Sequence, residues 1–282
     1  MTILVFGKTG QVGMELAKLG AGITSLGREE ADLTDPASCA AQIQNYRPRA
    51  VINAAAYTAV DKAEDEPERT HVINADAPAA MAREAAAQAI PFVHISTDYV
   101  FDGSGDKPWQ ETDETGALNT YGRTKAAGEA AIREAGGRYA ILRTSWVYSE
   151  HGSNFLKTML RLGGERDALS IVGDQIGGPT PARKIAETCF KIANVLRASP
   201  ERSGTYHFSG TPNVSWAEFA EAIFSAAKLE VAITRIPTSD FPTPAARPKN
   251  SRLDCRSLKT VFGIEQPDWR ASLPELLDSL SD

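Results

Sequence analysis

A glycine-rich turn directly after an apolar run near the start of the chain constrains the fold most. Ile3–Phe6 has the pattern of a buried strand, Gly7-Lys-Thr-Gly10-Gln-Val-Gly13 follows it, and Gln11–Leu19 has helical periodicity. Glycines there let the backbone approach a pyrophosphate, and the helix N-terminus offers N–H donors and a positive dipole end. The turn predicts a dinucleotide site, although its G-x-x-G-x-x-G spacing also suits a tight packing turn between a strand and a helix.

Strand-like and helical segments alternate through the first half of the chain. The further strand-like runs are 23–26, 50–55, 92–96 and 140–147, and the further helical patterns are 75–89 and 121–134. Such alternation indicates βαβ units, and therefore a parallel sheet covered by helices on both faces. We expect an α/β fold with a doubly wound, Rossmann-type parallel sheet.

The second half of the chain is less regular. Helical periodicity returns at 182–196, and residues 206–208 have a short strand pattern. Ser215-Trp-Ala-Glu218 fits a capping box that opens a helix extending to about Ala227. Residues 237–250 carry four prolines and predict a long loop, which is a common location for function.

The length and charge of the chain limit its organisation and its partners. A chain of 282 residues allows an α/β domain with a smaller appended lobe. We expect residues 1–150 to form the dinucleotide-binding core, and 151–282 mainly a substrate-binding C-terminal lobe with some segments returning to the core. The net charge is −6, and no run of Lys or Arg offers a footprint for nucleic acid or an anionic membrane. Without a signal-peptide pattern or a bilayer-length apolar run, the expected location is cytoplasmic.

The cysteines and histidines give no sign of a disulfide or a metal site. Cys39, Cys189 and Cys255 are far apart and form no CxxC pair, which predicts free buried thiols. The four histidines form no HxxxH or HxH pair. We therefore expect no metal site built on His or Cys ligands.

The end of the second strand bears on the choice of cofactor. In a dinucleotide site this strand end meets the adenosine ribose, and an acidic residue there favours a free 2′-hydroxyl. The sequence here is Leu26-Gly27-Arg28, which has no acid and offers an arginine to a 2′-phosphate. This favours NADPH, with NADH and a merely solvated Arg28 as the alternatives, and Asp32-Leu33 is placed to lie near the adenine.

The sharpest chemical signal is Tyr121-Gly-Arg-Thr-Lys125. Its phenol and ammonium stand at i and i+4 on one helical face. A nearby ammonium is expected to lower the pKa of the phenol and make it a usable acid near neutral pH. Thr97 ends the strand at 92–96, at the sheet edge where ligands bind. The set follows an Asn-Ala-Ala-Ala strand end (53–56) and predicts carbonyl–alcohol chemistry on a bound substrate.

Taken in order, these motifs resemble the extended short-chain dehydrogenase/reductase family, and within it the reductases of nucleotide-linked 4-keto sugars. The resemblance covers nearly the whole chain. Its stretches are 6–13, 53–64, 96–101, 108–112, 119–122, 143–148, 154–160, 174–175, 178–180 and 242–251. It implies NAD(P)H-dependent reduction of the 4-keto group of dTDP-4-dehydro-L-rhamnose to dTDP-L-rhamnose, a step in cell-surface polysaccharide biosynthesis.

The resemblance also implies roles for the residues at matching positions. Tyr121 would be the proton donor, Lys125 its partner and a ribose ligand, and Thr97 the third catalytic hydroxyl. The implied substrate contacts are Thr97, Asp98, Tyr99, Trp146 and Arg247, although the residue pattern alone would place Trp146 in the core. The implied cofactor contacts, besides Tyr121 and Lys125, are Gly7, Gly10, Gln11, Val12, Gly13, Arg28, Asp32, Leu33, Ala54, Ala55, Ala56, Tyr57 and Thr58.

One position departs from the family pattern. Some relatives form Mg²⁺-linked dimers through acidic side chains, and Glu15 matches one of these acids. Arg183 stands where another acid is expected, which argues against the metal. We expect Glu15 to be a solvated or salt-bridged helix residue, or, in a homodimer, to pair with Arg183 of a neighbouring chain.

Two other functions remain as alternatives. A nucleotide-sugar epimerase or 4,6-dehydratase would share the fold, but a dehydratase commonly carries Asp-Glu after the threonine, where this chain has Asp98-Tyr99. A non-catalytic regulatory subunit would also share the fold. It would not need the intact set of Thr97, Tyr121 and Lys125.

Overall fold

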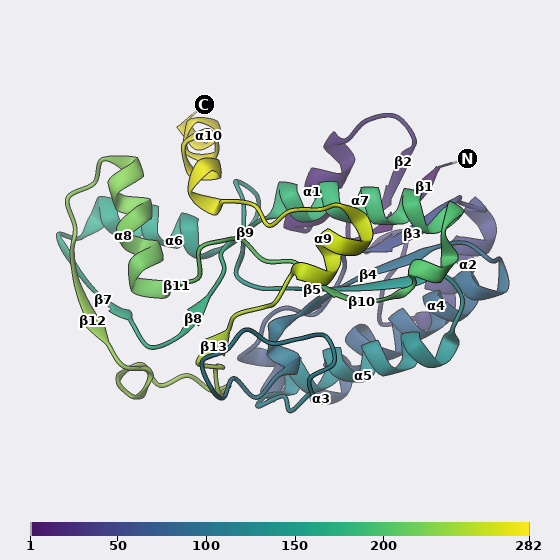
Figure 1. Ribbon diagram of the computed structural model, residues 1–282, viewed down its shortest axis with the longest axis horizontal. Helices are drawn as coiled ribbons and strands as arrows, with labels where there is room; N and C mark the ends of the chain where they lie inside the picture. The colour runs from purple at the N-terminus through teal and green to yellow at the C-terminus, as the bar shows by residue number, and fades with distance from the viewer. Residues whose placement is uncertain (1, 282) are drawn as a thin grey trace.

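The computed structural model describes residues 2–281 and has a six-stranded parallel sheet at its centre (Figure 1). The strand order is β10-β5-β4-β3-β1-β2. The strands are β1 Ile3–Phe6, β2 Ile23–Leu26, β3 Ala50–Asn53, β4 Phe92–Thr97, β5 Tyr139–Thr144 and β10 Gly204–His207. The order reverses between β1 and β3, which is the point where doubly wound sheets bind ligands. The expected fold class is confirmed.

Helices cover both faces of this sheet. On one face lie α1 (Gln11–Lys18) and α7 (Ala182–Ala198), and on the other lie α4 (Ala77–Ala87) and α5 (Thr120–Ala135) (Figure 1). Successive side chains of a strand point to opposite faces. Within β1, Ile3 and Val5 therefore join the core beneath α7, whereas Leu4 and Phe6 join the core beneath α4. This two-sided burial explains why the strands are continuous apolar runs.

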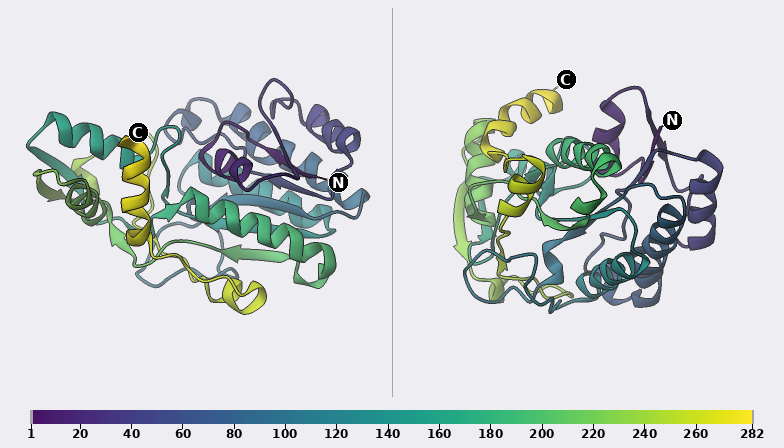
Figure 2. Two further views of the ribbon diagram at one scale, coloured as in Figure 1. Left: turned by 90° about the horizontal axis from the view of Figure 1, so that it is seen from above. Right: turned by 45° about the vertical axis from the view of Figure 1, so that its right-hand side comes forward.

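A smaller group of elements extends beyond one end of the sheet (Figure 2). Its helices are α6 (Phe155–Glu165), α8 (Trp216–Ala227) and α10 (Trp269–Ser281). Its strands are β7 Ala168–Val172, β8 Ile176–Gly177, β11 Val214–Ser215, β12 Ala232–Ile236 and β13 Asn250–Ser251. A separate core with several aromatic side chains holds it together. The predicted capping box at Ser215 and Glu218 opens α8, as expected.

Three local predictions differ from the structure. The strand expected over 140–147 is broken, because β5 ends at Thr144 and β6 (Val147–Tyr148) begins after Trp146, whose φ of +49° interrupts extended backbone. The helix expected at 75–89 begins earlier, with α3 (Pro67–His71) leading through a π-helical turn into α4. Helix α2 (Pro36–Tyr46) has no counterpart among the predicted elements, because it buries few side chains and so has weak periodicity.

The cysteines and the helices bear on two expectations from composition. Cys39, Cys189 and Cys255 are all buried free thiols, as expected. No helix within residues 2–281 combines the length and the apolar character that crossing a membrane requires.

Candidate active site

A pocket of about 600 Å³ opens at the carboxyl ends of the central strands. The glycine turn after β1, the loop after β3, the end of β4 and the start of α5 all contribute to it. The structure thus brings together residues that are far apart in the sequence. The expected site residues that line it are Gly7, Gly10, Gln11, Val12, Arg28, Asp32, Leu33, Ala54, Ala55, Ala56, Tyr57, Thr58, Thr97, Asp98, Tyr99, Tyr121, Lys125 and Trp146.

Each of the three glycines of the turn is needed for a different physical reason. Gly7 has a φ of +104°, and a Cβ on Gly13 would lie 1.9 Å from the Gly7 carbonyl oxygen, so both are needed for the turn itself. Gly13 is not among the residues that line the pocket. A Cβ on Gly10 would meet no protein atom closer than 3.5 Å, yet Gly10 faces the pocket. Only Gly10 therefore keeps space open for a ligand rather than for the protein.

The start of α1 fits the pyrophosphate of a dinucleotide. Gly10 is the N-cap, and no side chain within residues 2–281 caps the first turn of the helix. The leading N–H groups of a helix have no intrahelical acceptor, and together with the helix dipole they favour an anion. The donor set and the open face of Gly10 thus suit a phosphate-bearing cofactor.

The loop after β3 is held in place by Asn74 from the π-helical turn Val72–Asp76. The amide N–H of Tyr57 donates to Asn74 Oδ1 at 2.8 Å, and Asn74 Nδ2 donates to the Tyr57 carbonyl at 3.2 Å. Gly128 of α5 allows this turn to pack closely, since a Cβ there would lie 2.2 Å from the Asn74 carbonyl oxygen. Asn74 is a buried positioning residue that the sequence patterns did not single out. Unusual helical turns often occur at functional sites.

Tyr121 lies in the first turn of α5, which Asn119 caps by accepting from the Gly122 N–H at 2.8 Å. Burial raises the pKa of Tyr121 to about 12, a hydrogen bond with Thr97 opposes that rise, and the Asp98 charge adds to it. The expectation that Lys125 lowers this pKa is therefore wrong for the structure described. The cost of forming a phenolate in these desolvated surroundings outweighs the other influences.

Lys125 does not offset this effect of burial, because its amine is bonded to the protein. Its Nζ lies 2.7 Å from the Ile95 carbonyl oxygen and 2.9 Å from His94 Nε2. Lys125 is almost fully buried, and desolvation lowers its pKa to about 8. A charged lysine with so little solvent is costly, so this side chain changes charge near the physiological range.

His94 and Asn53 form a buried chain behind Lys125. The Ala55 N–H donates to Asn53 Oδ1 at 3.1 Å, which leaves Asn53 Nδ2 as the donor to His94 Nδ1 at 3.1 Å. Burial and the Lys125 charge lower the pKa of His94 well below its usual range, so the ring is neutral where its Nε2 lies against the Lys125 amine. Sequence patterns gave no signal for His94, since a single histidine inside a strand is typical of ordinary core packing.

A buried ion pair anchors α5 to the sheet beneath the site. Glu129 accepts from Arg143 at 2.6 and 2.9 Å and from the Ser96 hydroxyl at 2.6 Å. These bonds hold the pKa of Glu129 below its usual range despite complete burial. Because the pair joins α5 to β4 and β5, it fixes the height of Tyr121 and Lys125 above the strand ends.

Two stacked indoles form one wall of the pocket. The rings of Trp146 and Trp216 have centroids 3.5 Å apart and an interplanar angle of 8°, and both residues line the pocket. A Cβ on Gly177 would lie 2.8 Å from the Trp146 ring, so this glycine makes room for it. Trp146 therefore lies at the site rather than in the core. Trp216 is a further pocket residue that the sequence patterns did not identify.

Asp98 places a carboxylate beside Thr97 in the same pocket. Its side chain is buried, its Oδ1 accepts from the Thr97 hydroxyl at 3.1 Å, and its Oδ2 meets no donor at hydrogen-bond distance within residues 2–281, although the Ser251 side chain lies near enough to stabilise the charged carboxylate. Burial raises the pKa of Asp98 to about 6. A buried oxygen without a partner is costly and is suited to accept a hydrogen bond from a ligand hydroxyl.

Two arginines from the sequence analysis lie in different positions. Arg28 is exposed and lines the pocket near Asp32, whose pKa is lowered by the Thr34 N–H and by the Arg28 charge. Arg247 does not line the pocket, because Asp61 holds its guanidinium at 2.7 Å. Arg28 thus lines the pocket itself, whereas Arg247 lies behind it, near enough for its charge to act on the pocket residue Tyr99.

The position that resembles a metal site does not fit Mg²⁺. Glu15, Glu150 and His151 lie close enough to share an ion. However, Glu15 already accepts from His151 Nε2 at 2.8 Å and from Lys18 at 3.2 Å, and Lys18 also pairs with Glu150. Glu15 is buried and salt-bridged, so the expectation that it is salt-bridged is confirmed and the alternative that it is solvated is wrong. Arg183 pairs with Glu187 and Glu275 of its own chain, which opposes pairing with a neighbouring chain.

Comparisons with known proteins agree with this geometry. Residues 1–281 match the family described as RmlD substrate binding domain. The dTDP-4-dehydrorhamnose reductase of Escherichia coli strain K12 is 42% identical over 99% of this chain and 98% of its own. That of Burkholderia thailandensis is 46% identical over 96% of each chain. The Bacillus anthracis reductase of the same name, solved in complex with NADP, is 36% identical with a TM-score of 0.91, covering 99% of this chain and all of its own.

Proposed function

The chain belongs to the RmlD substrate binding domain family, and on this premise we propose that it reduces the 4-keto group of dTDP-4-dehydrorhamnose with NADPH. The observation that carries the proposal is the convergence of Thr97, Tyr121 and Lys125 on the pocket that the glycine turn also lines. The complex of the Bacillus anthracis relative with NADP supports the choice of cofactor. When bound, NADPH would supply the hydride that the keto carbon receives.

The residues of the chain would supply the proton and the electrostatics of this reaction. Tyr121, with a pKa near 12, stays protonated at neutral pH and is suited to donate its phenolic proton to the carbonyl oxygen. The Thr97 hydroxyl, which donates to Asp98 Oδ1 in the structure, would turn to donate to the same oxygen as negative charge develops on it. Lys125 would bind the cofactor ribose and stabilise the phenolate left after proton transfer. This division of roles follows from the charge state of each group.

The substrate would lie between Asp98 and the stacked indoles. We assign the unpartnered Asp98 Oδ2 to a sugar hydroxyl and the Trp146 face to the apolar side of the sugar ring. The first turn of α1, Ala54–Thr58 and Arg28 would hold the dinucleotide. The held position of Arg247 argues against its direct contact with the substrate.

The test is consumption of NADPH, followed by absorbance, when nucleotide-linked 4-keto-6-deoxy sugars are added one at a time. We expect rapid oxidation with dTDP-4-dehydrorhamnose and slower oxidation with the UDP- or GDP-linked analogues. An epimerase or a regulatory subunit would show no net oxidation with any of them. That result would overturn the proposal.

A further inference from the structure

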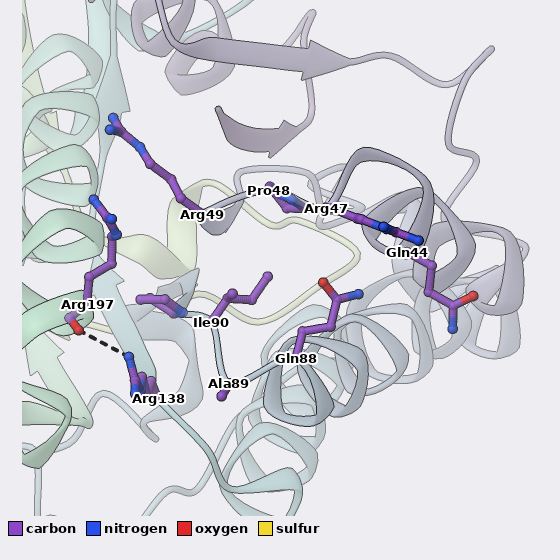
Figure 3. Close-up of a pocket in the computed structure, with 10 residues that line it drawn as sticks. Gln44, Arg47, Pro48, Arg49, Gln88, Ala89, Ile90, Arg138 and Arg197 are labelled. Carbon is purple, nitrogen blue, oxygen red and sulfur yellow. Dashed lines mark hydrogen bonds between the residues drawn. The ribbon is translucent and has the colours of Figure 1, made fainter. Parts of the chain in front are cut away.

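A second pocket lies at the opposite edge of the central sheet and is lined by four arginines (Figure 3). Arg49 directly precedes β3, Arg138 directly precedes β5, Arg47 caps the end of α2, and Arg197 lies in the last turn of α7. The strands are parallel, so this is their amino-terminal edge. At about 3.3 Å per residue, the six residues of β4 separate it from the catalytic edge by roughly 20 Å.

The charge of this pocket is unusual for a chain with a net charge of −6. No acidic side chain within residues 2–281 lines it, and none of the four guanidinium groups takes part in an ion pair there. The carboxylate of Glu84 accepts hydrogen bonds from two residues of the pocket, Gln44 and Gln88. Like charges gathered without a counter-ion repel each other, and a bound anion would relieve this.

Some of the positive charge is already offset. Helices α2, α4 and α7 all end at this pocket, and the carbonyl groups at helix C-termini carry partial negative charge. Arg138 uses one donor on the carbonyl oxygen of Arg197 at 3.1 Å. The remaining N–H donors of the four guanidinium groups make no hydrogen bond within residues 2–281 and can still bind a ligand. Arg49 Nε is buried with no hydrogen-bond partner within the described part of the chain.

The shape and lining indicate the class of ligand. The depression has a volume of about 690 Å³, and its arginines lie at both of its ends, so a ligand that contacts them all would need more than one anionic group (Figure 3). Arg49 and Arg197 extend along one flank of the pocket, and Arg47 lies at the other end (Figure 3). The lining also includes Pro48 and Ile90, and no aromatic side chain within residues 2–281 lines the pocket to stack on a base. Guanidinium groups bind phosphate oxygens through two parallel hydrogen bonds.

We propose that this arginine pocket, formed around Arg47, Arg49, Arg138 and Arg197, binds a small anion carrying two or more phosphate groups. The site is separate from the catalytic pocket and does not depend on the proposed reaction. Its ligand would bridge the ends of α2 and α7 across the sheet edge. Binding would therefore stabilise the fold without entering the chemistry.

The test is calorimetric titration of the full chain with inorganic pyrophosphate, in the presence of saturating NADPH to fill the glycine-turn site. We expect one saturable site whose affinity falls at least tenfold in Arg49→Gln and in Arg197→Gln. The matched control is Arg166→Gln, an exposed arginine of the far lobe, which should bind like the wild type. Orthophosphate should bind more weakly than pyrophosphate.

A second variant separates binding from folding. Arg47 has a φ of +44°, in the left-handed region where glycine is favoured at the end of a helix. Arg47→Gly should leave the melting temperature of the anion-free protein unchanged or raised, while reducing the rise that pyrophosphate produces. Three results would overturn the proposal: no saturable binding, equal binding in all variants, or equal affinity for orthophosphate and pyrophosphate.

Discussion

The amine of Lys125 lies 2.9 Å from Nε2 of His94, whose Nδ1 lies 3.1 Å from Nδ2 of Asn53. Burial and the charge of Lys125 lower the pKa of His94 well below its usual value, so the histidine is neutral while the lysine keeps its ammonium up to about pH 8. This relationship changes how the site behaves with pH. The tyrosine one helical turn away keeps its proton because burial raises its pKa to about 12.

The affinity for NADPH should fall as the pH rises through about 8. The pKa of Lys125 is lowered to about 8, so its ammonium is present below that pH and is lost above it. If only the ammonium form holds the ribose, the Kd should increase by up to about tenfold per pH unit above 8. Fluorescence titration of NADPH between about pH 7 and pH 9 measures this. In Lys125→Met the Kd should be higher and flat over this range, and the same slope in both proteins would contradict the assignment.

Tyr121→Phe should lower kcat by about 10²–10⁴-fold with little change in KM, because it removes the general acid and leaves the ring in place. Steady-state assays with NADPH and the keto sugar give both constants. Tyr139→Phe at the start of β5 is the matched control, since Tyr139 lies outside the pocket, and it should retain the wild-type kcat. A kcat for Tyr121→Phe close to wild type would remove this residue from the role of proton donor.

Substitutions of the turn glycines should separate ligand binding from folding. Gly10→Ala meets no close protein atom, so its stability should change by no more than about 1 kcal/mol while the NADPH Kd rises at least about tenfold. Gly13→Ala should unfold at much lower temperature, because its Cβ would lie 1.9 Å from the Gly7 carbonyl oxygen. Gly164→Ala within α6 has open space and should be neutral or stabilising. Unchanged NADPH binding in Gly10→Ala would refute the pyrophosphate assignment.

Arg28→Ala should weaken NADPH more than NADH. Arg28 lines the pocket just after β2, where Leu26-Gly27-Arg28 carries no acid at the strand end, and the acidic residue of this stretch that lines the pocket, Asp32, comes four residues later. A charge-assisted contact is worth about 1.5–3 kcal/mol, and the exposure of Arg28 places it near the lower end, so about a tenfold rise in the KM for NADPH is expected. Measurement of KM for both cofactors decides the matter. Equal effects on the two would leave Arg28 as a surface charge.

Activity and oligomeric state should not depend on Mg²⁺. The carboxylates of Glu15 and Glu150 are already satisfied by Lys18 and His151, and Arg183 adds a positive charge at the rim. A divalent cation would have to displace an ammonium group from hard oxygen ligands. Dialysis against EDTA, followed by kinetics and sedimentation, tests this. A loss of mass or rate that added Mg²⁺ restores would return Glu15 to the role of a metal ligand.

The sequence by itself determined those features that depend on neighbours in the chain. The glycine turn after β1 is recognisable because a tight turn and a close ligand approach both require local backbone freedom. Tyr121 and Lys125 share a helical face because four residues make about one turn. The alternation of strands and helices likewise indicated a doubly wound sheet, since two-sided burial gives each strand a continuous apolar run.

Only the tertiary structure decided which distant groups meet and how much water they keep. The sequence spacing suggested that Lys125 acidifies Tyr121, but His94 and Ile95 from β4 take the amine and burial raises the tyrosine pKa. The stacking of Trp146 on Trp216, and the gathering of four arginines at the far edge of the sheet, join segments separated by tens of residues or more. Desolvation and long-range contact are properties of the packed fold, so no local pattern encodes them.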